Sequence, residues 1–169
     1  SYLQDDTTSI KKIHQNTIYF RGNSSVNKFN GININTIGKV SILGNIIDAE
    51  LPNTVIPIYV EKCNLLNQVN QNDYWIKAAN VNFRILKDSF SSVKDYLKWS
   101  KVGKSELNVI PNFNSPSNNG FISSSSELQN IVDTDSTMIE DFVNTRRSIP
   151  KSDCGALENS ILDLKLSRV

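Results

Sequence analysis

The amino-acid sequence predicts a mainly β fold with α-helical additions, organised as a small β-barrel around residues 36–87. Three consecutive stretches of this region alternate apolar and polar residues, as strands with one buried face do. An amphipathic pattern typical of a helix follows them at residues 89–102. A glycine also interrupts the first stretch, and a long first strand with a sharp bend lets a small closed barrel turn its corner.

Each of the three strands has one feature beyond its alternation. The first, at residues 34–51, contains Gly44, which indicates a bulge, a sharp bend or the close approach of another backbone. The second, at residues 55–62, contains Pro57, which cannot donate to a ladder and therefore predicts an edge strand or a bulge. The third, at residues 74–86, is interrupted by Ala-Ala-Asn, which predicts either a bulge or a division into two strands.

Capping patterns locate the helices of the remaining chain. Ser92 and Asp95 resemble a capping box at the start of the first helix, and Thr137 and Glu140 form the same pattern in a second helical region. Strict alternation over residues 161–169 favours a closing strand, although the apolar positions also fit a helix face. The predicted organisation is an N-terminal arm with a short strand (1–28), the barrel with its helix (29–113), a mobile loop (114–126) and C-terminal helices with the closing strand (127–169).

The composition narrows the classes of function. The 169 residues include 18 Lys and Arg against 17 Asp and Glu, a formal net charge of +1. This balance argues against a broad polyanion-binding surface but leaves room for a local basic groove. The chain contains no apolar run long enough for a transmembrane helix and no signal-peptide pattern. Its two cysteines do not form a disulfide framework in the sequence.

Catalytic and metal-binding motifs are missing from the sequence. His14 is the single histidine, so neither a metal site nor a catalytic triad can be assembled from recognisable spacings, and we expect His14 at the surface. The sequence has no Walker A motif and no G-x-G-x-x-G motif. An enzyme is therefore the least expected class, and no cofactor is predicted.

Three phrases carry a resemblance to a known family. They read F-N-G-I-N-I-N-T-I-G-K-V-S-I-L-G-N-I-I-D-A-E, I-P-I-Y-V-E-K and Y-W-I-K-A-A. Together with the order of strands and helix over residues 29–113, they resemble the OB fold of the middle subunit of replication protein A and its telomere-capping paralogues. The acidic D-D-x-T that this family carries after the second strand is absent, and the C-terminal third does not look like a winged helix. The resemblance implies a nuclear module of a complex that handles single-stranded DNA or caps telomeres.

The same resemblance implies a binding surface for single-stranded DNA, in which aromatic rings stack on bases and basic side chains follow the phosphates. Trp75 and Phe83 share a face with apolar residues, which makes core packing their alternative role. Tyr59 and Arg84 lie on the polar faces of their strands and are the better candidates. The complete set is Tyr59, Tyr74, Trp75 and Phe83 for stacking, with Lys62, Lys77, Arg84 and Lys87 for phosphate.

Two alternatives remain open at this stage. The first is an interaction domain that binds a partner subunit or a second copy of itself and no nucleic acid. The near-zero net charge favours it, as does an apolar helix face formed by Met138, Ile139, Phe142 and Val143. The second is a different β-rich adaptor, such as a pleckstrin-like fold, with the C-terminal helix as its cap.

Overall fold

The computed structural model describes residues 9–99, 105–115, 120–134, 137, 139–141 and 143–157. The described residues are mainly β with one short α-helix. The elements are β1 (Ile10–His14), β2 (Thr17–Arg21), β3 (Lys28–Asn35), β4 (Lys39–Leu43), β5 (Ile46–Lys62), β6 (Leu65–Asn70), β7 (Asp73–Val81), β8 (Phe83–Ile85), β9 (Asp88–Phe90), α1 (Val93–Trp99), β10 (Phe113–Ser115), β11 (Gly120–Ser123), the 3₁₀ helix η1 (Ser126–Leu128), β12 (Val132–Asp133) and β13 (Lys151–Ser152).

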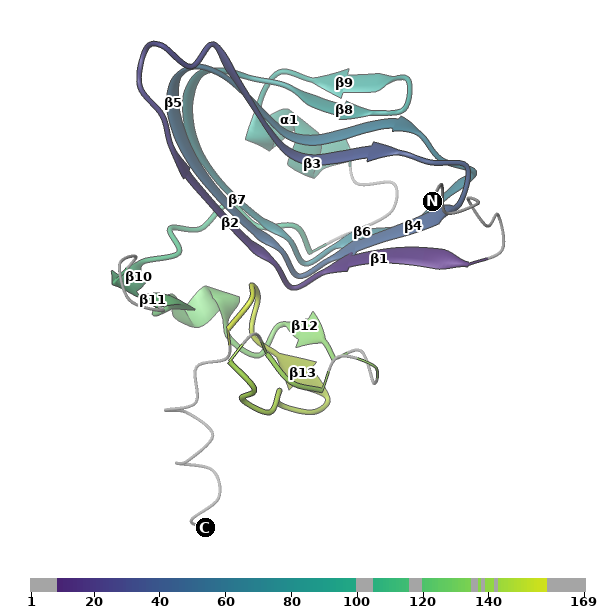
Figure 1. Ribbon diagram of the computed structural model, residues 1–169, viewed down its shortest axis with the longest axis vertical. Coiled ribbons are helices and arrows are strands. Elements are labelled where there is room, and N and C mark those ends of the chain that lie inside the picture. The colour runs from purple at the N-terminus through teal and green to yellow at the C-terminus, as the bar shows by residue number, and fades with distance from the viewer. Residues whose placement is uncertain are drawn as a thin grey trace, which may run out of the picture.

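The first eight strands form three stacked coils. β1, β4 and β6 pair in parallel, as do β2, β5 and β7, while β3 and β8 flank the second half of β5 in parallel. Residues one circuit apart lie side by side, as Ile10, Lys39 and Leu65 do, with a period of about 27 residues. The arrangement is a parallel β-helix, and Figure 1 shows its two long sheets meeting at a corner.

The core fills the inside of these coils. Ile34, Val60 and Ile85 occupy equivalent positions in successive coils, in register with one another, and all three are almost fully buried. Alternation along each strand sends one set of side chains inward and the other outward. The period-two pattern of the sequence therefore identified strand-forming residues, because a buried face has this period whichever strand lies alongside. The predicted bounds were wrong: the strand expected at 34–51 is divided at Gly44, and its second half continues through the strand expected at 55–62 as β5.

The corner between the two sheets depends on three residues in the left-handed region. Gln15, Gly44 and Gln71 have φ values of 51°, 66° and 56°. Gly44 therefore lies at a sharp bend between β4 and β5, which is one of the alternatives its position predicted. A Cβ atom at Gly44 would also lie 2.7 Å from Val132 Cγ1, so this position has room only for glycine, whereas the corners of the first and third coils carry Gln15 and Gln71.

The third coil is closed at its end by β9 and α1. Tyr96 of α1 stacks on Phe83 at a centroid distance of 4.1 Å, and Val93 is buried beside them. Asp95 N donates to Ser92 Oγ over 3.0 Å, and Ser92 Oγ donates to Asp95 Oδ2 over 2.6 Å. The prediction that Ser92 and Asp95 cap this helix is therefore confirmed, but the helix begins at Val93 and not at residue 89, because residues 88–90 form β9.

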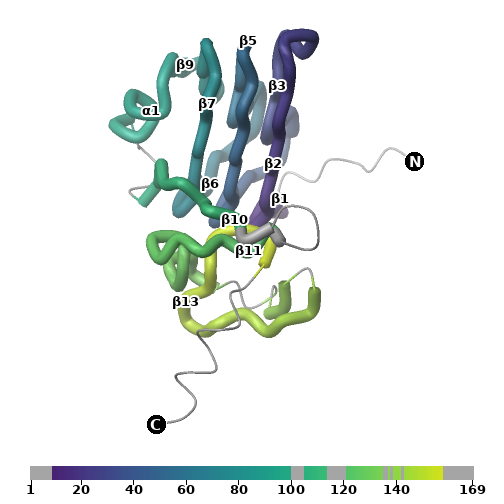
Figure 2. The backbone as a smooth tube through the Cα atoms, turned by 90° about the vertical axis from the view of Figure 1, so that its left-hand side faces the viewer, coloured from purple at the N-terminus to yellow at the C-terminus, as the bar shows by residue number. Residues whose placement is uncertain are grey.

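The C-terminal part of the chain packs against the outside of the corner, below the coils in Figures 1 and 2. Leu128 and Val132 are fully buried there against Leu43 and Ile46, which face outward from β4 and β5. The buried thiol of Cys154 belongs to the same cluster. These contacts use outward-facing apolar residues of the corner as a second, smaller core.

The expected barrel is not found in the described residues, and an OB fold is not confirmed. The strands of residues 29–86 pair mainly in parallel with strands about one circuit away, whereas only β8 and β9 form an antiparallel hairpin in this stretch. Pro57 lies on a central strand rather than an edge. It falls between the last pair of β5 with β7 (Val55 and Val81) and the first pair with β8 (Tyr59 and Arg84), where its missing N–H costs no ladder bond.

The predicted C-terminal helix is also wrong for the residues that the structure describes between 127 and 147. They form η1, β12 and turns, and no α-helix. Asp141 Oδ1 accepts hydrogen bonds from Val143 N and Thr145 N, and Asn144 has a positive φ of 63°. A side chain that binds the backbone in this way competes with helix formation. Residues 161–169, where a closing strand was predicted, lie outside the described residues.

Candidate functional site

The outward side chains of β2, β5 and β7 form two rows across three neighbouring strands. Tyr19, Asp48 and Trp75 lie in register in the first row, and Arg21, Glu50 and Lys77 lie in register in the second. We call these six residues the outer face. In the first row an acidic side chain therefore lies between two aromatic ones. In the second row an acidic side chain lies between two basic ones.

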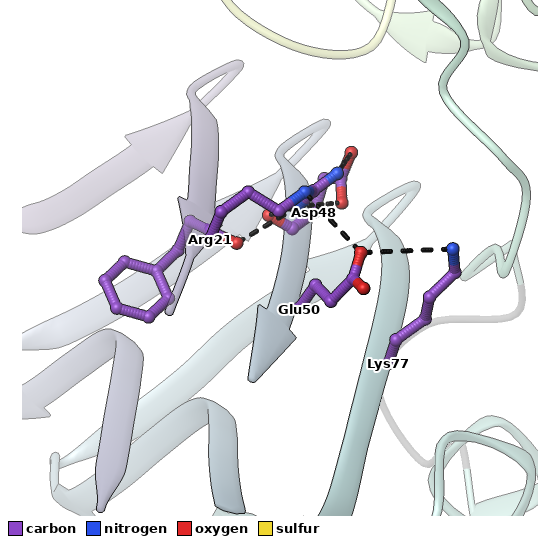
Figure 3. Close-up of polar contacts among 5 residues, drawn as sticks. Arg21, Asp48, Glu50 and Lys77 are labelled. Atoms are coloured by element: carbon purple, nitrogen blue, oxygen red, sulfur yellow. Dashed lines mark hydrogen bonds and ion pairs between the residues drawn. The ribbon is translucent and has the colours of Figure 1, made fainter. Parts of the chain in front are cut away.

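The charged groups of the outer face are already paired (Figure 3). Arg21 binds Asp48 through two parallel hydrogen bonds, Nη1–Oδ1 of 2.7 Å and Nη2–Oδ2 of 3.0 Å. Glu50 Oε2 lies 3.7 Å from Arg21 Nε and 4.0 Å from Lys77 Nζ. The side chain of Asp48 is 6% exposed, whereas those of Glu50 and Lys77 are more than half exposed. The hydrogen bond to Asp48 raises the pKa of Arg21 above its ordinary value.

The aromatic rings of the outer face are supported by cations and by the C-terminal segment. The Arg21 guanidinium carbon lies 4.1 Å from the centroid of Tyr19, and Lys77 Nζ lies 5.9 Å from that of Trp75. Phe113 and Phe121 of the β10–β11 hairpin pack against Tyr19 at centroid distances of 6.0 and 5.5 Å. The hairpin therefore borders the outer face on one side and fixes the Tyr19 ring.

A shallow hollow of about 310 Å³ lies at the opposite border. Its lining includes Glu50 and Lys77, together with Gly22 directly after β2, Pro52 within β5 and Ala79 of β7. A ligand on the outer face would thus meet paired charges at its centre and half-buried rings at its sides. Within the part of the chain that the structure describes, no group of three His, Cys, Asp or Glu residues is arranged to hold a metal ion.

Four of the eight residues predicted to bind nucleic acid lie around a different surface, where Lys62, Arg84 and Lys87 are exposed and Tyr59 is half-buried. Tyr59 and Arg84 are neighbours in register on β5 and β8, with the guanidinium carbon 6.0 Å from the ring centroid. Lys62 at the end of β5 and Lys87 beyond β8 are both exposed. The sequence predicted correctly that Tyr59 and Arg84 lie outside the core.

Two of the predicted stacking residues are wrong. Tyr74 and Phe83 are fully buried and pack edge to face in the core at a centroid distance of 5.1 Å, so neither ring can reach a base. Trp75 points outward, although the alternation had grouped it with the core face. The register of β7 against β5 shifts after Ala78, and Val81 then packs inward as Ala78 does, so the phase of alternation changes within β7. A shift of one residue exchanges the two faces. Trp75 and Lys77 therefore belong to the outer face, away from Tyr59.

The predicted partner-binding residues are only partly described. Ile139 and Val143 are exposed, with 50% and 44% of their surfaces accessible. Met138 and Phe142 lie outside the described residues. His14, expected at the surface, is buried and its Nε2 lies 2.9 Å from Ser41 Oγ.

Sequence reasoning missed Tyr19, Arg21, Asp48 and Glu50 as members of one site. The signal that could have found them is an internal repeat, in which Gln or Gly precedes an asparagine at positions 16, 45 and 72. Aligning the three asparagines places Tyr19, Asp48 and Trp75 at the same step of each repeat.

Comparisons with known proteins give no relative for this chain. No family model matches it, and neither the curated proteins nor the solved structures that were searched contain a match. Among the described helices, none is long and apolar enough to cross a membrane.

Proposed function

We propose that this chain is a non-enzymatic binding module that holds a glycan chain on the outer face. The observation that carries the proposal is the row of Tyr19, Asp48 and Trp75, with the paired charges of the second row beside it. Stacked coils of this kind offer extended surfaces suited to extended ligands.

The chemistry of the two rows suits a sugar better than a polyanion. An aromatic ring offers an apolar face to the C–H face of a pyranose, and charged groups held in place offer fixed partners to its hydroxyls. Two acids and two bases balance each other here, so the surface does not select for phosphate. Tyr19 and Trp75 are two strands apart, about 10 Å, which a short oligosaccharide can span.

The proposal is tested with two classes of probe on the intact chain. Isothermal titration with linear neutral hexasaccharides of glucose, xylose and N-acetylglucosamine is compared with titration of a 20-nucleotide oligo(dT). We expect at least one saccharide to bind, with an affinity that changes little between 50 and about 200 mM salt because no counterions are released. Failure of every saccharide in the panel would contradict the proposal.

Single-stranded DNA is a second candidate, on the surface around Tyr59. The Tyr59–Arg84 pair, with Lys62 and Lys87 exposed nearby, provides a ring for stacking and cations for phosphate. This hypothesis needs only that surface, not a barrel, and it would give the chain a nuclear role in handling single strands. Oligo(dT) binding that falls steeply with salt and is lost in Arg84→Glu, but not in Trp75→Ala, would support it.

A further inference from the structure

The asparagines at the corner form a hydrogen-bonded ladder with a direction. Asn16 donates its backbone N–H and its Nδ2 to Asn45 Oδ1, both over 2.9 Å. Asn45 donates in the same way to Asn72 Oδ1, over 2.9 and 2.8 Å. The middle rung, Asn45, therefore gives two hydrogen bonds to the next coil and receives two from the previous one. We call Asn16, Asn45 and Asn72 the corner ladder.

The two ends of the corner ladder differ. At the donor end, Glu106 takes the place of a further asparagine: its Oε2 accepts from Asn72 N over 2.7 Å and its Oε1 from Asn72 Nδ2 over 3.3 Å. At the acceptor end, no described group donates to Asn16 Oδ1, and Asn16 is exposed. The ladder is thus closed after the third coil and open before the first.

Among the described residues, the same end of the coils also has unpaired strand edges and a hollow. β2 and β3 pair only with β5 among the described strands, so each has one edge without a strand beside it. A hollow of about 460 Å³ lies between β1 and β3 and is lined by Ile13, Ile34 and Val40 as well as by polar residues. At the opposite end of the coils, α1 packs Val93 and Tyr96 against the core.

We propose that the end formed by β1–β3 is a docking site for a further parallel β-coil, whose own ladder asparagine donates its N–H and Nδ2 to Asn16 Oδ1. The docking would continue the contact that already joins the three coils, burying the lining of the hollow and pairing the free edges of β2 and β3. This site is separate from the outer face and does not depend on glycan binding.

The direction of the ladder decides which coil fits. The third coil of a second copy cannot dock there, because both donors of its Asn72 are occupied by Glu106. Two first coils placed face to face would bring two Asn16 acceptors together without a donor. The occupant is therefore a coil with an uncapped asparagine, and not a second copy of this chain.

The second coil of the chain provides a probe. In this variant, a copy of residues 37–64 replaces residues 1–9 and ends directly before Ile10. The last two residues of the copy then join the added coil to β1 as residues 63 and 64 join β5 to β6. In this position the copy of Asn45 takes the same place above Asn16 that Asn45 takes above Asn72. A Gly-Ser segment of equal length is the control for added mass, and the same coil with Leu at the copied Asn45 is the control for the ladder.

Three measurements decide the outcome. We expect the added coil to resist limited proteolysis, amide exchange in β2 and β3 to slow at least tenfold, and the melting temperature to rise by several degrees, with all three effects reduced in the leucine control. An added coil digested as fast as the Gly-Ser segment, with exchange in β2 and β3 unchanged, would overturn the proposal. If the leucine control resists proteolysis and slows amide exchange as much as the asparagine-containing coil, the proposed role of Asn16 Oδ1 as the acceptor would be overturned. Circular dichroism of each protein first establishes that the original coils are folded.

Discussion

Glu106 closes the corner ladder by accepting both of the hydrogen bonds that Asn72 would otherwise give to a fourth coil. The same carboxylate accepts from the hydroxyls of Tyr74 and Tyr96, each over 3.2 Å, so it joins the ladder to the core and to α1. A glutamate can take the place of the asparagine of a further coil here, because its two oxygens accept from two donors at once. The end of the third coil is therefore built by a specific residue as well as by the covering helix.

Replacement of Glu106 by leucine should destabilise the protein strongly. Four donors would lose their acceptor in a buried environment, and each unsatisfied buried group costs about 1–3 kcal/mol. We expect a fall of at least about 3 kcal/mol in the free energy of unfolding, measured by urea denaturation. Glu140→Leu, at an exposed position, is the matched control and should change stability little. A fall of less than about 0.5 kcal/mol would show that the cap is not structural.

Stability should decrease as the pH rises from about 5 to 8. Burial raises the pKa of Glu106 to about 7, and burial likewise raises the pKa of Asp73 to about 7. Between their ordinary values and pH 7 the folded protein holds protons that the unfolded chain releases. The stabilisation that this supplies is complete below pH 4 and is lost as the pH rises through 7. Urea midpoints at several pH values measure it, and Glu106→Gln should flatten the dependence; a midpoint that rises over this range would contradict the assignment.

The middle rung of the corner ladder should matter more than the open one. Asn45 is fully buried, accepts two hydrogen bonds from Asn16, and donates to Asn72 and to the Ile13 carbonyl. Asn16 is exposed, and its side chain only donates. We expect Asn45→Ala to cost about 2–4 kcal/mol and Asn16→Ala about 1 kcal/mol. Equal losses in the two variants would contradict a directional ladder.

The two acids of the outer face should differ in their contribution to stability. Asp48→Asn leaves Arg21 without its buried partner, so we expect a loss of about 1–3 kcal/mol. Glu50→Gln breaks only exposed ion pairs and should change stability by less than about 0.5 kcal/mol. Thermal unfolding of both variants checks the difference, and a larger loss in Glu50→Gln would be inconsistent with the burial of Asp48.

Local patterns of the sequence predicted local structure well. The alternation around Val40 and Ile42 identified strands, Gly44 identified a bend, and Ser92 with Asp95 identified the start of α1. These features are decided by side chains and φ values within a few residues. These local features do not determine which strands are neighbours. A barrel and a β-helix share the same two-residue period, so only the order of the strands favoured a barrel.

The candidate site could be predicted only through the repeat. The phase of alternation breaks within β7, between Ala78 and Val81, so Tyr74 and Trp75 were assigned to each other's faces. The apolar pattern around Ile139 predicted a helix, but Asp141 binds the following backbone and forms a turn instead. Asp48 and Glu50 look like ordinary polar positions until the coils bring Arg21 and Lys77 beside them.

The outer face is tested most directly by titrating the best-binding hexasaccharide into three proteins: the original chain, Trp75→Ala and Tyr59→Ala. Trp75 lies on the outer face, and Tyr59 is a half-buried aromatic on the other surface, so the two variants remove similar rings from different sites. We expect Trp75→Ala to weaken binding at least tenfold, about 1.4 kcal/mol, and Tyr59→Ala to leave it unchanged. Binding that survives in Trp75→Ala, or that is lost equally in Tyr59→Ala, would contradict a glycan site on the outer face.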